Sequence, residues 1–324
     1  MAKANSAKLF SPSRKCLRLQ TERVQAYVLN RGLFDEALAA KAQAQGADYF
    51  FGCRVTNISI GKDRAGVEAF CDGSKEMLNA RAVLLASGLN PGLSRKLGLG
   101  EINGFLVGAQ TEVETEPIAE VEIYFDQQIE PGCFAWLVPV APNRALIGLL
   151  STSQAKLNLE KFLLSPSCRD RIVSRRAQIR QKAIPLGTLP RTYGDRMLVI
   201  GDAGGQVKPT TGGGIYFGHI GTKIAIKVLN EALSEDNLAA NRLSRYQKEW
   251  KAKLGKEIRF GYWVRQAFTK LSNNHIDYLF YLAGKRGMPE AIATSKNFSF
   301  DWHSRLLLQL ASSLVPFVQP SRTL

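Results

Sequence analysis

The pattern of apolar and polar positions divides the chain into buried strands, alternating strands and helices. Apolar runs that close on small residues, at 82–88 and 196–200, are typical of strands buried in a parallel sheet. Between residues 105 and 150 apolar and polar residues alternate, and turns at 130–132 and 142–143 interrupt the alternation. Several short strands in series predict an antiparallel sheet inserted between the two apolar runs.

A helical period is evident in other segments. Residues 33–45 carry Phe34, Leu38 and Ala42 four positions apart, and Gly46 ends the pattern. The further predicted helices are 158–164, 167–176, 220–233, 238–269, 277–282 and 302–314, and the further predicted strands are 24–29, 48–60, 66–71 and 76–85. Together these elements predict an α/β (α+β) fold that ends in helices. Residues 1–20 are expected to be loosely attached.

The largest concentration of glycine follows the strand at 196–200 and reads GDAGGQVKPTTGGGI, residues 201–215. Backbone this bare lets a ligand approach peptide N–H groups that side chains would otherwise shield. The second glycine cluster opens a predicted helix, where unpaired N–H groups and the positive dipole end attract negative charge. Asp202 stands at the strand's end, where an ionised carboxylate accepts hydrogen bonds from ligand hydroxyls. The pattern favours a site for a polyhydroxylated ligand with an electron-rich ring over a purely structural turn.

This stretch resembles the flavin-contacting motif of the geranylgeranyl reductase family, FAD enzymes of the hydroxybenzoate-hydroxylase fold that saturate isoprenoid double bonds. The resemblance implies that Asp202 holds the ribityl chain of FAD at the strand end formed by Gly201. It also implies that Pro209 and the helix start at Gly212, Gly213 and Gly214 lie against the pyrimidine end of the flavin ring. Related hydroxylases usually carry His where this chain has Gly205, and this difference favours the reductase branch.

Three further residues resemble flavin contacts of the family. Arg31, at the start of the helix predicted from residue 33, is placed near the flavin cleft by the resemblance; a solvated arginine is the alternative. Ser87 and Gly88 close the apolar run at 82–88, where the family usually has Ala-Asp/Thr-Gly. A plain turn at the end of the strand is the alternative for that pair.

The segment FAWLVP, residues 134–139, resembles the family's aromatic-x-Trp-x-Phe-Pro motif beside the lipid tunnel. Phe134 and Trp136 are two positions apart and therefore share one face of a strand. The resemblance implies that they border a lipid substrate. An aromatic pair in the core is the alternative, since aromatic side chains dominate cores.

Enzymes of this fold begin with a strand, a Gly-x-Gly-x-x-Gly turn and a helix, and the present sequence contains no such turn. The resemblance therefore implies a Rossmann-like FAD-binding domain that is incomplete at its N-terminus. We expect it to span 20–98 and 186–233, with an antiparallel substrate domain at 99–185 and a helical region at 234–324. A start site placed too late, a truncated gene and an N-terminal half supplied as another polypeptide are the three explanations considered.

Composition adds few constraints. The net charge of +15 favours anionic partners, and basic and aromatic residues interleave in the C-terminal helices, as at a membrane interface. No nucleic-acid module, metal-ligand spacing, secretory signal or membrane-spanning apolar run is apparent, so a cytoplasmic protein with peripheral contact at the inner membrane face is expected. The five widely spaced cysteines are expected to be reduced thiols and not a disulfide framework.

The resemblance implies a flavin-dependent oxidoreductase of lipid biosynthesis that reduces C=C bonds in a geranylgeranyl or polyprenyl chain. Its electron donor would be NAD(P)H or a ferredoxin, and no proton donor can be named. A flavin-dependent monooxygenase of the same fold is one alternative. A non-catalytic remnant that binds lipid or a protein partner is the other.

Overall fold

The computed structural model of the chain describes residues 2–175, 177–294 and 302. The chain divides into two compact units. Unit 1 consists of Met1–Val28, Val107–Lys182 and Phe260–Leu324, and unit 2 consists of Leu29–Leu106 and Ala183–Arg259. Helix α5 (Ala240–Phe268) contributes residues to both. The helix predicted at 302–314 falls, apart from residue 302, outside the described residues.

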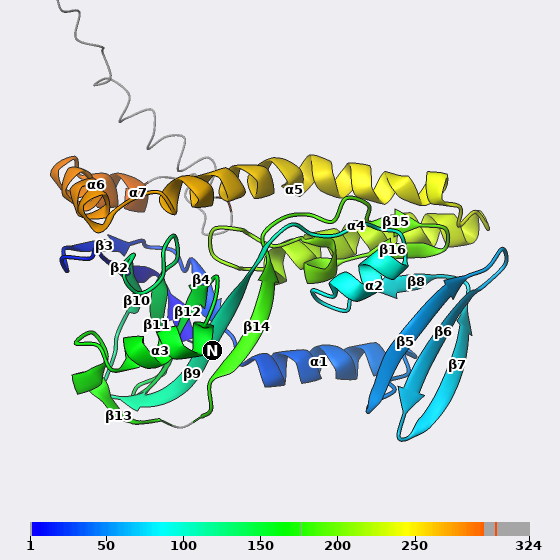
Figure 1. Cartoon of the computed structure of the whole chain (residues 1–324), viewed down its shortest axis with the longest axis horizontal. Coiled ribbons are helices and arrows are strands. Elements are labelled where there is room, and N and C mark those ends of the chain that lie inside the picture. Colours follow the sequence, from blue (N-terminus) through cyan, green and yellow to red (C-terminus); the bar gives the residue numbers. More distant parts are fainter. Residues whose placement is uncertain (1, 176, 295–301, 303–324) are drawn as a thin grey trace, which may run out of the picture. The chain divides into compact units, whose positions relative to one another are not determined.

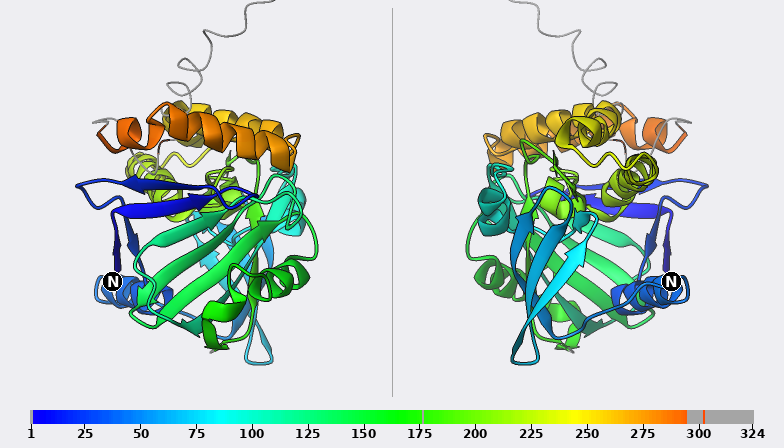
Figure 2. Two further views of the ribbon diagram at one scale, coloured as in Figure 1. Left: turned by 90° about the vertical axis from the view of Figure 1, so that its left-hand side faces the viewer. Right: turned by 90° about the vertical axis from the view of Figure 1, so that its right-hand side faces the viewer.

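Unit 1 is built on an eight-stranded sheet (Figure 1; Figure 2, left). Its strand order is β13 (Ile172–Arg175), β9 (Phe105–Thr115), β12 (Arg144–Ser151), β11 (Ala135–Ala141), β10 (Val121–Tyr124), β2 (Ser6–Phe10) and β3 (Cys16–Gln20), with β14 (Arg180–Pro185) also paired to β9. Strands β10 and β2 run parallel, and the antiparallel pairs include β9–β12, β11–β12 and β2–β3. The predicted inserted antiparallel sheet is thus present and larger than expected.

The core of unit 1 lies between this sheet and helix α3 (Ala155–Leu163). Strand β9 alternates as a half-buried strand should, and its inward residues Ala109 and Val113 are fully buried. They join Leu159 and Phe162 of α3 in one apolar cluster. The remaining elements of unit 1 are β1 (Ala2–Ala4) paired with β4 (Ala26–Val28), the short helix η1 (Arg169–Arg171), α6 (Asn273–Lys285) and α7 (Met288–Thr294).

Two sequence predictions for unit 1 are wrong. The N-terminal residues were expected to be loosely attached, yet β2 and β3 form a hairpin inside the eight-stranded sheet. These strands contain few apolar residues, and charged residues stand between them, so the local pattern does not predict a strand. Their pairing with β10 cannot be predicted from local sequence. The helix predicted at 167–176 is instead η1 followed by β13, because strand β9 supplies hydrogen-bonding partners for β13.

Unit 2 contains a small sheet of order β15 (Tyr193–Gly194), β16 (Met197–Val199) and β8 (Val83–Leu85), and a separate meander of β5 (Cys53–Ile60), β6 (Ala65–Cys71) and β7 (Ser74–Ala80). Figure 1 shows the three meander strands side by side. The helices of unit 2 are α1 (Arg31–Gln43), α2 (Pro91–Lys96), η2 (Gly201–Gly204), α4 (Ile215–Ser234) and most of α5. Leu85, Met197 and Val199 are buried together with Ile58 of β5 in its core. The strand predicted at 76–85 is therefore two strands, β7 and β8, which belong to different sheets.

Strand β8 is at the end of its sheet. Among the described residues it pairs with β16 alone, and its central residue Leu84 is 37% exposed. Unit 2 also leaves other large apolar side chains exposed, among them Leu33, Leu38, Tyr49, Phe50 and Phe51. None of the residues of α1 is buried.

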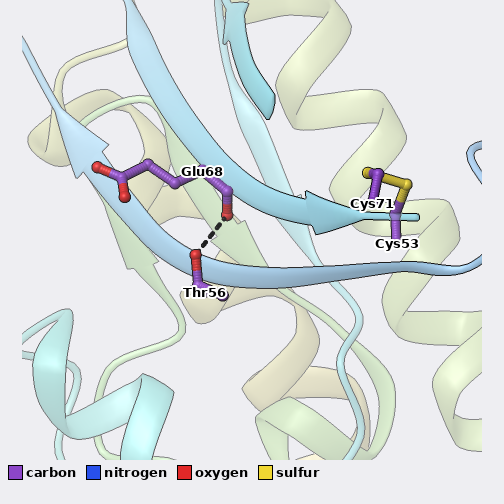
Figure 3. The surroundings of a disulfide bond; sticks show 4 residues. All are labelled: Cys53, Thr56, Glu68 and Cys71. Carbon is purple, nitrogen blue, oxygen red and sulfur yellow. Dashed lines mark hydrogen bonds between the residues drawn. A yellow bond between two sulfur atoms is a disulfide. The ribbon is translucent and has the colours of Figure 1, made fainter. Parts of the chain in front are cut away.

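The prediction that all five cysteines are reduced thiols is wrong for two of them. Cys53 and Cys71 form a disulfide between β5 and β6, where they are directly opposite each other in the register (Figure 3). Their separation of 18 residues matches no sequence pattern, and only the strand register brings them together. Cys16, Cys133 and Cys168 are free. In the part of the chain that the structure describes, no helix is both long and apolar enough to span a bilayer.

Candidate functional site

The candidate site lies where β8 and β16 end. These strands are parallel, with Leu85 opposite Val199, and the Ile200 amide donates a hydrogen bond of 3.0 Å to the Leu85 carbonyl. Since carboxyl ends of parallel strands meet at one edge, the turns that follow, Ser87-Gly88 and Gly201-Asp202, leave from the same edge. Ligands of α/β sheets bind at such an edge, so the structure brings four of the predicted cofactor residues to a suitable place.

A small pocket opens at this edge. Its lining includes Ser87, Gly88 and Asn90, and Ala203 from the turn after β16. At Gly88 and Gly201 an added β-carbon would meet nothing within 4 Å, so the backbone of both turns borders open space. The arrangement leaves peptide groups accessible to a ligand, as the glycine content predicts.

Backbone crowding explains why residue 205 is a glycine. Its φ is +71°, and its amide donates to the Asp202 carbonyl at 3.1 Å to close the turn after η2. An added β-carbon would collide with the carbonyl oxygen of Gly187. A histidine at this position, as in the related hydroxylases, would therefore require a different turn.

A buried hydrogen-bond chain fixes the start of the turn. The Gly201 amide donates to Gln206 Oε1 at 2.9 Å, and Gln206 Nε2 donates to the Tyr246 hydroxyl at 2.6 Å. The Tyr246 hydroxyl donates to the Val199 carbonyl at 2.8 Å. Gln206 and Tyr246 are both fully buried, so each bond is shielded from water. Helix α5 thus holds the glycine turn through Tyr246, which lies 40 residues from Gln206 in sequence.

The second half of the motif leads into α4. The Gly212 amide donates to the Lys208 carbonyl at 2.9 Å, and the Lys208 amide donates to the Gly213 carbonyl at 3.1 Å. Gly214 is the N-cap of α4. A β-carbon there would lie 2.7 Å from Asp202 Oδ1, so the carboxylate of Asp202 lies close beside the first turn of the helix. The positive end of the helix dipole favours negative charge at this place.

Thr211 has an unsatisfied hydroxyl within the same turn. Among the described residues, only Thr115 and Thr211 have a buried side-chain oxygen without a hydrogen-bond partner. Buried polar atoms are almost always paired, so an orphan invites an explanation. At Thr211 a ligand with polar ring atoms at the start of α4 would supply the missing partner.

Arg31 is engaged elsewhere. It forms an ion pair of 2.9 Å with Asp35, four residues later on α1, and both side chains are more than half exposed. Arg31 is also absent from the residues that line the pocket at the β8 edge. The geometry agrees with the solvated alternative, and a cofactor role for Arg31 stays a prediction.

Phe134 and Trp136 lie in unit 1 as neighbours on one face of the sheet, with ring centroids 6.0 Å apart. Phe134 also approaches Phe125, whose ring contacts those of Phe268 and Phe280. Trp136 Nε1 donates to Gln110 Oε1 at 3.2 Å. Both rings are only partly buried, so they form the margin of an aromatic cluster and not its centre. The substrate role predicted for them is not tested by this geometry.

Three residues of the site were missed in the sequence. Gln206 and Thr211 stand inside the motif, but nothing in their type or spacing distinguishes a positioning amide or an orphan hydroxyl. Tyr246 has no local signal, because its role depends on the packing of α5 against the turn. In the described ranges no group of three or more His, Cys, Asp or Glu side chains is placed to hold a metal ion.

Comparisons with known proteins identify the family. The family model described as "Lycopene cyclase protein" matches residues 18–276. A digeranylgeranylglycerophospholipid reductase 1 from Methanothermobacter thermautotrophicus is 30% identical over 289 residues, which is 85% of this chain and 72% of that protein.

Solved structures show the same fold. A geranylgeranyl bacteriochlorophyll reductase-like protein from Thermoplasma acidophilum superimposes with a TM-score of 0.82 at 20% identity, over 97% of this chain and 81% of that one. The flavin-dependent halogenase CmlS gives a TM-score of 0.66 at 14% identity, over 97% of this chain and 66% of that one. By its sequence and its fold, the chain belongs to the geranylgeranyl reductase family of FAD-dependent oxidoreductases.

Proposed function

We propose that this chain binds FAD at the carboxyl edge of β8 and β16 and reduces C=C bonds in a geranylgeranyl or polyprenyl lipid chain. The observation that carries the proposal is the glycine turn at this edge, with the carboxylate of Asp202 beside the first turn of α4. The relative from Methanothermobacter is named a digeranylgeranylglycerophospholipid reductase, and this name supports the substrate class.

The residues at the edge fit the two ends of a flavin nucleotide. Asp202 accepts hydrogen bonds, as a ribityl chain of hydroxyl groups requires. The Gly212 amide is engaged by the Lys208 carbonyl, and the start of α4 at Gly213 and Gly214 would present a positive dipole end to the carbonyl oxygens of the pyrimidine ring. The buried hydroxyl of Thr211 fits the same polar end, since it lacks a partner among the described residues.

Bound FAD in its reduced form supplies a hydride equivalent, and the protein supplies position and exclusion of water. Asp202 and the glycine turn orient the cofactor, and the Gln206–Tyr246 chain holds the turn in place. Phe134 and Trp136 would offer an apolar margin against a prenyl chain, which has no polar group to recognise. NAD(P)H and a ferredoxin both remain candidate electron donors.

Flavin affinity of the purified chain tests the cofactor part of the proposal. Asp202→Ala is expected to weaken binding of FAD about 10- to 100-fold, because hydrogen bonds to a charged group contribute roughly 1.5–3 kcal/mol. Asp63→Ala, at an exposed position in the β5–β6 turn of the same unit, is the matched control and should leave the affinity unchanged. A native chain that takes up no flavin, or equal affinities for both variants, would contradict the proposed site.

The reaction is tested separately with chemically reduced, flavin-loaded protein under anaerobic conditions. A geranylgeranyl lipid should gain two hydrogen atoms for each double bond reduced, as read by mass spectrometry. Oxygen-dependent incorporation of an oxygen atom in place of hydrogen would favour the monooxygenase alternative instead.

A further inference from the structure

Helix α6 of unit 1 has two unlike faces. Its inner face is apolar: Ile276 is 2% exposed, and the ring of Phe280 lies 5.9 Å from that of Phe125. Its outer face carries Tyr278, Leu279 and Tyr281, which are 60%, 41% and 50% exposed. A helix on the surface of a globular protein usually places charged residues on that face. Here two tyrosines three positions apart stack on each other, with ring centroids separated by 6.5 Å.

Lysines flank these rings from two elements. Lys15 Nζ, in the turn of the β2–β3 hairpin, is 5.8 Å from the centre of the Tyr281 ring. Lys285 Nζ, at the end of α6, is 5.9 Å from the same ring. We call Lys15, Tyr278, Leu279, Tyr281 and Lys285 the α6 face. Figure 1 shows α6 lying beside β3, and these two elements are in contact.

The single carboxylate of α6 belongs to Asp277, and it is occupied by the hairpin. Asp277 Oδ1 accepts hydrogen bonds from the Ser13 amide at 3.0 Å, from Ser13 Oγ at 2.6 Å and from Ser11 Oγ. These bonds fasten α6 to the β2–β3 turn and so fix Lys15 beside Tyr281. The α6 face therefore presents positive charge around an aromatic and aliphatic centre.

We propose that the α6 face docks on the anionic surface of a lipid bilayer. Tyrosine rings suit the headgroup level, because one end of the ring is apolar and the other is wet. Lysines beside them attract acidic phospholipids, each contributing about 1 kcal/mol near the surface.

Charge complementarity selects the bilayer as the occupant. The chain carries a net charge of +15, which draws it toward anionic surfaces in general. Leu279 and the apolar parts of the tyrosines can then contact acyl chains, and a nucleic acid backbone offers no such apolar partner. None of the residues of the α6 face belongs to the proposed flavin site, so the two proposals can fail independently.

Vesicle co-sedimentation of the full chain, without added flavin, tests the proposal. The native chain should bind vesicles of phosphatidylcholine with a quarter phosphatidylglycerol and should bind pure phosphatidylcholine much more weakly. The double variant Lys15→Gln with Lys285→Gln should lower partitioning into the anionic vesicles about 30-fold, because it removes the attraction of two lysines to acidic lipids. Tyr278→Ser with Tyr281→Ser should lower it about tenfold on both kinds of vesicle.

Helix α3 of the same unit provides matched controls. Lys156→Gln with Lys161→Gln removes the same charge from exposed positions. Leu157→Ser with Leu164→Ser removes apolar side chains that are 44% and 72% exposed. Neither control should change partitioning by more than about twofold. Equal losses in the control and α6 variants would overturn the proposal, because net charge alone would then explain binding. The proposal would also be overturned if the native chain did not bind the vesicles. It would be overturned too if a single-stranded oligonucleotide released all of the bound protein from them.

Discussion

At the scale of single residues, the candidate site depends on two fully buried side chains, those of Gln206 and Tyr246. Gln206 satisfies the Gly201 amide, and Tyr246 satisfies both Gln206 and the Val199 carbonyl. Gly221 of α4 allows this arrangement, because any β-carbon at Gly221 would occupy the space of the Gln206 amide group. The geometry of the glycine turn is thus determined by α4 and α5 as well as by its own sequence.

Tyr246→Phe should therefore weaken flavin binding about tenfold, because it leaves Gln206 and Val199 without their buried partner. Trp250→Phe is the matched control, since Trp250 is equally buried on α5 and donates to Thr192 Oγ1 at 2.9 Å, outside the turn. Both variants should lose roughly 1–3 kcal/mol of unfolding free energy in urea. Only Tyr246→Phe should change the affinity measured by flavin fluorescence; equal affinities at equal stability would refute the positioning role.

At the scale of elements, the sequence predicted long periodic segments well. Helices α4 and α5 were expected at 220–233 and 238–269, and they span Ile215–Ser234 and Ala240–Phe268. The parallel strands were also expected, because an apolar run that ends on small residues is a local signal. Partners distant in sequence were not predictable: the β2–β3 hairpin, the division between β7 and β8, and β13 all depend on which strand lies alongside.

The residues of the candidate site also divide into those that the sequence predicts and those that it does not. Ser87, Gly88, Gly201 and Asp202 were proposed from two separate motifs, and the parallel register of β8 and β16 explains why both motifs belong to one edge. The site's supporting residues, Gln206 and Tyr246, could not be predicted, since burial and side-chain direction decide their role. Arg31 forms an ion pair with Asp35 of its own helix, and its cofactor role stays a prediction.

The β5–β6 disulfide is the second feature that register alone reveals. Cys53→Ser with Cys71→Ser should lower the unfolding free energy by about 3 kcal/mol, the value expected for a closed loop of this size. Dithiothreitol should lower the stability of the native chain by the same amount in urea titrations. Cys16→Ser, which alters an exposed free thiol, is the control and should cause no loss. A native chain insensitive to dithiothreitol would show that the bond is absent in solution.

At the scale of the whole molecule, the proposed site suits only one half of FAD. The described contacts suit the flavin ring and the ribityl chain, and the sequence of residues 1–324 contains no Gly-x-Gly-x-x-Gly turn for the ADP half. If these residues alone hold the cofactor, FMN and FAD should bind this chain within about threefold of each other. Isothermal titration with each flavin measures this ratio.

ADP provides the control for that comparison. A large excess of ADP should not displace FAD when the ADP half makes no contact. A preference for FAD of more than about 100-fold, together with competition by ADP, would show that other residues of the chain bind the nucleotide half.

The free side of β8 has a practical consequence for the protein in solution. Among the described residues no strand pairs with the outer edge of β8, so this edge is a template on which another chain can assemble. The exposed apolar side chains of unit 2 would reinforce such assembly. The isolated chain should therefore form larger species as its concentration rises. A peptide strand that pairs with this edge would keep the chain from assembling in this way.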